Sequence, residues 1–158
     1  MKARISTELK IANSLKKKKK TLAVAESCTG GLVSHRITDV PGSSKYFKGG
    51  VVAYSNMAKV SILAVPSGMI KKCGAVSREV ALAMAEGARS AFEADIAAAV
   101  TGIAGPSGGT AEKPVGLAYM AVVSGKVSKT RKVNFKGGRS ALKIKFSDAV
   151  LELIQKNI

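Results

Sequence analysis

Apolar and polar positions repeat with two different periods along the chain, and these periods predict alternating helices and strands. Segments in which apolar residues recur every three or four positions predict amphipathic helices with one face toward a core. Compact apolar runs bounded by Gly, Pro or Ser predict strands. The expected helices cover 6–18, 32–40, 56–63, 77–92 and 138–156, and the expected strands cover 21–25, 47–54, 95–100, 116–124 and 126–135.

The order of these elements predicts an α/β layered domain. Strands alternate with helices through most of the chain, which is typical of parallel strands covered by helices. The last two strands meet at Ser124 and Gly125, a hairpin signal, so the sheet should be mixed. Pro66, Gly68 and Gly74 predict a loop between the helices at 56–63 and 77–92.

The composition fits one domain with an aliphatic core. The chain has 158 residues, of which 46% are hydrophobic and only 4% aromatic. No apolar run approaches the roughly 18 residues of a membrane helix, and the N-terminus lacks the apolar region of a secretory signal. Two cysteines do not make a disulfide framework. We therefore expect a cytoplasmic protein with a single domain over 1–158 and no membrane association.

The positive charge is concentrated at the two ends of the chain. The formal net charge is +16, and residues 1–20 carry eight basic residues and one acidic residue. The run Lys16 to Lys20 coincides with the end of the first helix, where lysines complement the helix dipole. A nucleic-acid interface is the alternative, but no interleaved aromatics or known module accompany the lysines. We expect weak, nonspecific nucleic-acid binding at most.

Most of the unusual chemistry follows the ends of predicted strands. The segments 26–31, 54–59 and 101–110 each begin where a strand ends, and ligands in α/β sheets bind beyond the carboxyl ends of strands. The loop 101–109 holds four glycines and a proline in the pattern GxxGxxG, which differs from both a P-loop and a dinucleotide fingerprint. We expect this loop to wrap an anionic ligand, although a structural crossover is the alternative.

The turn ESCTGG at 26–31 suits nucleophilic chemistry. Ser27, Cys28 and Thr29 supply small nucleophiles and donors, while Gly30 and Gly31 permit positive φ and let backbone N–H groups converge on an oxyanion or phosphate. A tight turn with a Ser/Thr cap is the plainer interpretation. Cys28 is an alternative nucleophile, although a cysteine after a buried strand is more often a small core residue.

A lysine is the best candidate for a general base. Lys59 falls in the first turns of a predicted helix, where the positive dipole end and partial burial would lower its pKa, and a neutral lysine can deprotonate a serine. An exposed helical lysine is the alternative. The only histidine, His35, lies eight residues beyond Ser27, which disfavours a Ser-His-Asp system. One His and two distant Cys do not make a metal site, so no metal is expected.

Five motifs in register resemble the CinA C-terminal domain family. They read LAVAESCTGGLVSHRITDVPGSS, FKGGVVAYSNMAK, GAVSREVALAMAEGAR, AVTGIAGPSGG and EKPVG, and the resemblance runs from about residue 5 to residue 155. It implies a three-layer α/β/α fold with a mixed five-stranded sheet in which one strand is antiparallel. Because the separate N-terminal domain of full-length CinA proteins is not in this chain, the resemblance implies a stand-alone amidohydrolase.

The resemblance also implies a reaction and its residues. The reaction is hydrolysis of nicotinamide mononucleotide to nicotinate mononucleotide and ammonia, in pyridine nucleotide recycling, without a cofactor and by a homodimer or higher homo-oligomer. Ser27 matches the nucleophile, Lys59 the base and Tyr54 its partner in proton transfer. The substrate would contact the turn 28–31 and the loop after the fourth motif, through Cys28, Thr29, Gly30, Gly31, Thr101, Gly102, Gly105 and Gly108.

One departure from the family pattern concerns the start of the last helix. The family usually has Gly-Asp-Arg there, with a second Arg four residues later, whereas this chain has Gly137, Gly138 and Arg139, with Lys143 at the later position. Arg139 is a candidate phosphate ligand whose altered neighbours leave a structural role open. Two alternatives to the enzyme remain, a non-catalytic nucleotide-binding domain and a basic nucleic-acid-binding protein.

Overall fold

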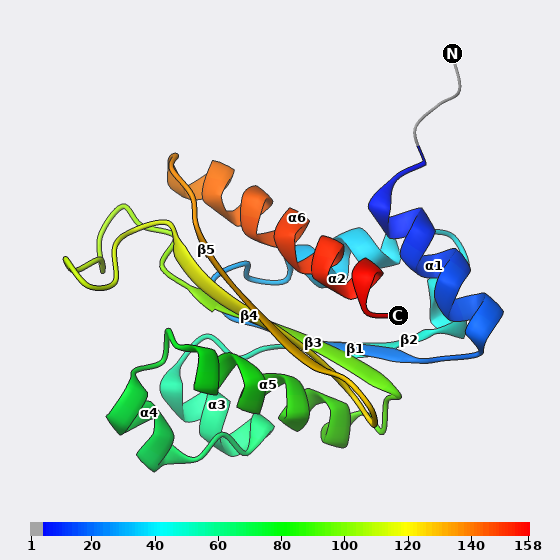
Figure 1. Ribbon diagram of the computed structural model, residues 1–158, viewed down its shortest axis with the longest axis horizontal. Coiled ribbons are helices and arrows are strands. Elements are labelled where there is room, and N and C mark those ends of the chain that lie inside the picture. The colour runs from blue at the N-terminus through cyan, green and yellow to red at the C-terminus, as the bar shows by residue number, and fades with distance from the viewer. Residues whose placement is uncertain (1–4) are drawn as a thin grey trace.

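A single twisted sheet forms the centre of the molecule. The computed structural model describes residues 5–158 and orders the strands β2-β1-β3-β4-β5 (Figure 1). β1 pairs in parallel with β2 and β3, while β4 pairs antiparallel with both β3 and β5, so β4 is the one strand that opposes the other four. The strands are β1 (Leu22–Glu26), β2 (Phe47–Val52), β3 (Ile96–Gly102), β4 (Leu117–Ser124) and β5 (Ser128–Asn134). The predicted mixed sheet is confirmed.

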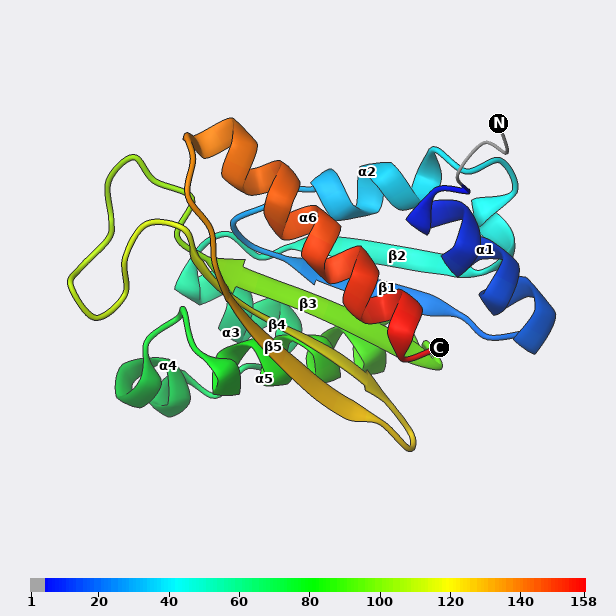
Figure 2. The ribbon, with the colours of Figure 1, turned by 45° about the horizontal axis from the view of Figure 1, so that its top comes forward.

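Helices cover both faces of this sheet and make three layers. α1, α2 and α6 lie on one face, and α3, α4 and α5 lie on the other (Figures 1 and 2). The helices are α1 (Thr7–Lys18), α2 (Leu32–Thr38), α3 (Asn56–Leu63), α4 (Ser67–Cys73), α5 (Arg78–Ala91) and α6 (Arg139–Lys156), with a short 3₁₀ turn at Ser43–Lys45. The expected three-layer α/β/α fold is therefore confirmed.

Alternating side chains of the central strands build two separate cores. Leu22 and Val24 of β1 face α1, α2 and α6, where Phe146 of α6 is fully buried. On the opposite face, β1 and β3 present mostly alanine side chains to α5, among them Ala23, Ala25, Ala97 and Ala99. Small residues on this face let α5 pack closely on the sheet, which explains how a chain poor in aromatics fills its core.

The loop expected around Pro66, Gly68 and Gly74 is wrong, because this segment contains helix α4. Pro66 and Gly74 flank the helix and mark its two ends instead of excluding it. Ile70 is buried in the core beneath α5, so tertiary packing stabilises a short helix that contains a glycine. Several boundaries also shift by one to three residues. Thr101 and Gly102 belong to β3, α2 ends at Thr38, and β2 ends at Val52, before Tyr54.

Gly87 in α5 marks the closest approach of α5 to the end of α3. A Cβ atom at position 87 would lie 2.0 Å from the carbonyl oxygen of Leu63, a contact that no side chain can make. Alanine normally stabilises a helix interior by about 1 kcal/mol relative to glycine. We expect Gly87→Ala instead to lower the free energy of unfolding by about 2 kcal/mol, as overpacking does.

Urea unfolding of two glycine variants checks this prediction. Gly68→Ala is the matched control, because a Cβ atom at position 68 of α4 meets nothing within 4 Å. We expect Gly68→Ala to leave stability unchanged or raise it. A Gly87→Ala protein as stable as the parent would contradict the close packing of α5 against α3.

Candidate active site

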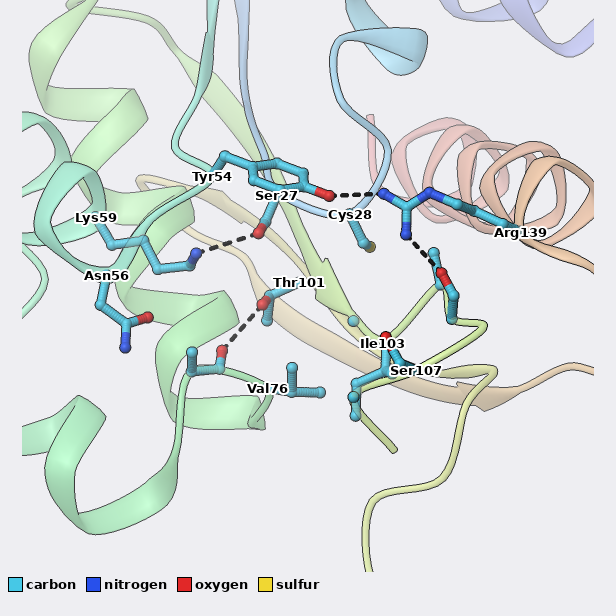
Figure 3. Close-up of a pocket in the computed structure, with 15 residues that line it drawn as sticks. Ser27, Cys28, Tyr54, Asn56, Lys59, Val76, Thr101, Ile103, Ser107 and Arg139 are labelled. Atoms are coloured by element: carbon cyan, nitrogen blue, oxygen red, sulfur yellow. Dashed lines mark hydrogen bonds between the residues drawn. The ribbon is translucent and has the colours of Figure 1, made fainter. Parts of the chain in front are cut away.

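A cleft of about 280 Å³ opens at the carboxyl ends of the parallel strands. The cleft is lined by the turn after β1, the segment that leads from β2 into α3, and the loop after β3 (Figure 3). The predicted site residues that line it are Ser27, Cys28, Tyr54, Lys59, Thr101, Gly102, Gly105, Gly108 and Arg139. Thr29, Gly30 and Gly31 are not among the lining residues.

Ser27 and Lys59 form the polar centre of this cleft. Ser27 comes directly after β1, and its backbone N–H donates to the carbonyl of Val100 at 3.1 Å. Lys59 lies in α3, which begins after the N-cap Ser55. The Lys59 Nζ lies 3.1 Å from the Ser27 Oγ and donates to the carbonyl of Ala53 at 2.9 Å. As a neutral amine, Lys59 keeps a lone pair that can accept the Ser27 hydroxyl hydrogen.

Burial favours the neutral form of Lys59. The residue is only 2% exposed, and desolvation lowers the pKa of its ammonium group below the ordinary 10.5. Within residues 5–158, no carboxylate forms an ion pair with Lys59 that would restore the charge. The plainer interpretation of an exposed helical lysine is therefore wrong. A lysine with a lowered pKa beside a serine hydroxyl is suited to general-base chemistry.

The lowered pKa of Lys59 predicts the pH dependence of any reaction that uses it as a base. The base must be unprotonated, so kcat/KM should rise with pH, pass an inflection below 10.5 and then level off. Initial rates between pH 5 and 11, corrected for the folded fraction, measure this profile. An inflection at or above 10.5, or a rate that falls as pH rises through this region, would contradict a neutral Lys59 base.

Cys28 is a poor nucleophile in this position. Burial raises the pKa of its thiol to about 12, with a smaller contribution from the negative charge of Glu26. The thiol therefore stays protonated at neutral pH, and the thiolate is the reactive form. Of the two adjacent candidates, Ser27 is the one that hydrogen-bonds to Lys59.

Tyr54 and Arg139 form a bridge across one side of the cleft. The Tyr54 hydroxyl accepts a hydrogen bond from the Arg139 Nη2 at 2.7 Å, and the Arg139 Nη1 donates to the carbonyl of Gly105 at 2.6 Å. The Tyr54 hydroxyl therefore points toward Arg139 rather than between Ser27 and Lys59 (Figure 3). The structure brings Tyr54 to the site but connects Ser27 with Lys59 directly.

One backbone amide of the turn, that of Cys28, is placed to receive an oxyanion, because Cys28 lines the cleft whereas Thr29 is fully buried and does not. The Gly30 N–H donates to the Ser27 carbonyl at 3.1 Å, and the Gly31 N–H donates to the Glu26 carboxylate at 3.1 Å. The N–H groups of Cys28 and Thr29 have no acceptor within the part of the chain that the structure describes. Gly30 and Gly31 instead supply the positive φ angles, 61° and 99°, that close the turn.

The wall opposite Ser27 is formed by a segment that sequence reasoning missed. Ala75 and Val76 line the cleft, and the Thr101 hydroxyl donates to the Ala75 carbonyl at 2.9 Å. Lys113 donates to the carbonyls of Cys73 and Val76 at 2.7 and 2.8 Å. Lys113 therefore ties the glycine-rich loop to this wall. Its place in the EKPVG motif was the sequence feature that could have pointed to the contact.

Other site classes find no support in the described residues. His35 lies on the exposed side of α2 and pairs with Asp39 at 3.5 Å, away from the cleft. No group of three or more His, Cys, Asp or Glu side chains within 5–158 is arranged to hold a metal ion. No helix of that range is long and apolar enough to cross a membrane.

The fold and the cleft together define a three-layer α/β/α protein with a serine and a buried lysine in contact at the strand ends. The chain belongs to the CinA family, because the model of the CinA C-terminal domain matches residues 4–158. The resemblance carried by the five motifs is thereby confirmed.

Related proteins and structures agree with this membership. The CinA-like protein of Geotalea daltonii is 49% identical over 148 residues, which cover 94% of this chain and 36% of that protein. The competence/damage inducible protein CihA of Agrobacterium tumefaciens is 36% identical with a TM-score of 0.88, covering 98% of this chain and 97% of that one. A CinA superfamily protein of Escherichia coli is 28% identical with a TM-score of 0.90, covering 98% and 94%. The chain spans about a third of the length of the curated relatives it matches.

Proposed function

We propose that the chain is an amidohydrolase that converts nicotinamide mononucleotide and water to nicotinate mononucleotide and ammonia. The observation that carries the proposal is the 3.1 Å contact between the Ser27 Oγ and the buried Lys59 Nζ. A serine beside a neutral amine, at a turn with free backbone amides, suits acyl transfer. The choice of substrate rests on the resemblance of the site motifs to nicotinamide-nucleotide amidohydrolases.

The reaction proceeds through an acyl-enzyme. The Ser27 Oγ attacks the carboxamide carbon as its proton passes to Lys59, and the N–H group of Cys28, which lines the cleft, receives the negative charge on the carbonyl oxygen. The Lys59 ammonium then protonates the leaving nitrogen, and ammonia departs as the C–N bond breaks. Water attacks the ester carbon with Lys59 again as the base, which releases the carboxylate product and restores the serine.

Arg139 is the group best suited to hold the phosphate of the nucleotide. Its guanidinium donates only to the Tyr54 hydroxyl and the Gly105 carbonyl, and within residues 5–158 it forms no ion pair with a carboxylate. A guanidinium with neutral partners can exchange them for the stronger, charge-assisted bonds of a phosphate. The glycine-rich loop around Gly105 and Gly108 borders the same part of the cleft.

A comparison of two substrates tests the proposal. We expect ammonia and nicotinate mononucleotide in equal amounts from nicotinamide mononucleotide. Nicotinamide riboside, which lacks the phosphate, should react with kcat/KM lower by about 10- to 100-fold, the value of one charge-assisted hydrogen bond. Absence of ammonia despite measurable binding of the nucleotide would favour a non-catalytic binding domain. Equal rates with both substrates would overturn the phosphate role of Arg139.

We also propose a homodimer, and exposed apolar side chains beside the cleft support this assembly. Met57 and Val60 of α3 are 77% and 36% exposed and line one mostly apolar hollow, which shares Asn56 with the cleft. Exposed apolar side chains gathered in this way are typical of an interface between subunits. Light scattering at micromolar concentration measures the mass directly, and a monomer throughout that range would contradict the proposal.

A further inference from the structure

The carboxylate of Glu26 is buried beneath the turn that carries Ser27. Glu26 is 0% exposed, and within residues 5–158 no Lys, Arg or His forms an ion pair with it. Its charge is instead balanced by five hydrogen bonds from the segment that follows the nucleophile. The donors are the Thr29 hydroxyl at 2.6 Å, the N–H groups of Gly31 and Val33 at 3.1 Å each, and the N–H and hydroxyl of Ser34 at 2.8 Å each.

These hydrogen bonds hold the segment that follows Ser27 in one conformation. The two oxygens of Glu26 divide the donors between them, so the segment from Thr29 to Ser34 wraps around one carboxylate. Thr29 is the first residue of this wrapped segment, and Cys28 lies between it and Ser27. The direction of the Cys28 amide therefore depends on the bonds made by Glu26.

The backbone of Glu26 also connects the nucleophile to the base. The Glu26 carbonyl accepts the Ala53 N–H at 2.8 Å, and the Ala53 carbonyl accepts the Lys59 Nζ at 2.9 Å. The side chain of Glu26 thus holds the turn that follows Ser27. Its backbone carbonyl holds Ala53, whose own carbonyl orients Lys59. Burying a carboxylate without a cation costs free energy unless its oxygens accept hydrogen bonds. For Glu26, all five donors come from the segment that follows Ser27.

We propose that Glu26 is a positioning residue that orients the Ser27 hydroxyl and the amide of Cys28 for attack and oxyanion binding. The inference rests on the proposed function for its reaction. Its effect should fall on kcat, because the turn orients reacting atoms, and not on KM, because Glu26 itself does not reach the cleft.

Glu26→Gln keeps the shape of the side chain and removes its capacity to accept five bonds. In either orientation, the amide nitrogen of glutamine faces at least one backbone N–H, of Ser34 or of Gly31 and Val33, which cannot accept a hydrogen bond. We expect kcat for nicotinamide mononucleotide to fall by about 100-fold, as small misplacements of reacting groups do, with KM changed by no more than about 3-fold.

A second readout reports on Ser27 without the natural substrate. A small alkyl fluorophosphonate forms a P–O bond with an activated serine as fluoride leaves and the serine proton passes to the base, and peptide mass spectrometry measures the rate. We expect Glu26→Gln to slow labelling of Ser27 by a factor similar to the loss in kcat. All rates are measured where circular dichroism shows the variant fully folded.

Asp95→Asn is the matched control. Asp95 also accepts a backbone N–H and a hydroxyl, both from Thr21 at 2.9 Å, and an ammonium bond from Lys20 at 3.1 Å. It lies just before β3, at the end of the sheet opposite the cleft. Loss of its bonds should lower stability but leave kcat and the labelling rate unchanged.

The outcomes separate this inference from the proposed function. Glu26→Gln with parental kcat and labelling rate would overturn the positioning role, as would an equal loss in Asp95→Asn. If Glu26→Gln does not fold, Thr29→Val, which removes one donor to Glu26, must lower kcat and the labelling rate in the same direction. If the parent is labelled but releases no ammonia, the proposed reaction fails and the labelling rates alone decide the role of Glu26. A parent that is neither labelled nor active would overturn both.

Discussion

Replacing Ser27 with alanine should lower kcat for nicotinamide mononucleotide by about 10⁴-fold or more, the scale of loss when a nucleophile acting with its base is removed. Alanine keeps the backbone of the turn and its free amides but leaves Lys59 without a hydroxyl to deprotonate. Ammonia release under saturating substrate measures the loss. Binding of the nucleotide, measured by calorimetry, should change little, because the hydroxyl contributes chiefly to the reacting state.

Cys28→Ala is the control for the identity of the nucleophile. The thiol is buried and held protonated, with a pKa near 12, so its loss should leave kcat within a few-fold of the parent. Activity that survives in Ser27→Ala and disappears in Cys28→Ala would transfer the nucleophile to Cys28. Activity that survives in both variants would point to direct attack by water.

Replacing Lys59 with methionine should lower kcat by about 10³-fold, within the range of general acid–base catalysis. Methionine fills a similar volume without a lone pair, so the Ser27 hydroxyl loses its base in both acylation and deacylation. Ammonia release at pH 8 measures the effect. Lys71→Met is the matched control, because Lys71 is exposed on α4 and does not line the cleft, and its kcat should equal that of the parent.

The same variant should be more stable than the parent at neutral pH. Because burial lowers the pKa of Lys59, the unfolded chain binds a proton at neutral pH more readily than the folded chain does. This difference in proton affinity lowers the free energy of unfolding of the parent. The loss is fully present below the lowered pKa of Lys59 and disappears as the pH approaches 10.5. The Tm advantage of Lys59→Met should therefore shrink between pH 7 and pH 10.5. A less stable and inactive Lys59→Met would indicate a structural role.

The sequence predicted where the site would form because of a simple property of parallel strands. Ser27 and Lys59 are far apart in the chain, but each follows a strand, and parallel strands place their carboxyl ends together. The spacing of apolar residues was sufficient to locate those strands. The hairpin signal at Ser124 and Gly125 predicted an antiparallel pair, which the structure confirms in β4 and β5. That one strand alone opposes the others was expected from the family resemblance, since strand order depends on long-range pairing that no local pattern encodes.

What the sequence missed depends on contacts between distant segments. α4 was hidden because Pro66 and Gly74 are local signals of a break, whereas the burial of Ile70 under α5 is a tertiary effect. The direction of the Tyr54 hydroxyl is set by Arg139, which lies 85 positions away in the chain. Glu26 belongs to a recognised motif, but a buried carboxylate with five donors cannot be distinguished from a surface one by residue type alone.

Activation of the Ser27 nucleophile by Lys59 is the central claim, and one labelling experiment tests it directly. The parent and Lys59→Met are treated with the alkyl fluorophosphonate, and the modified residue and its rate are read by peptide mass spectrometry. We expect a single modification at Ser27 in the parent, blocked by nicotinamide mononucleotide and slower by at least about 100-fold in Lys59→Met. Modification at Cys28, or equal rates at Ser27 in the two proteins, would contradict this claim.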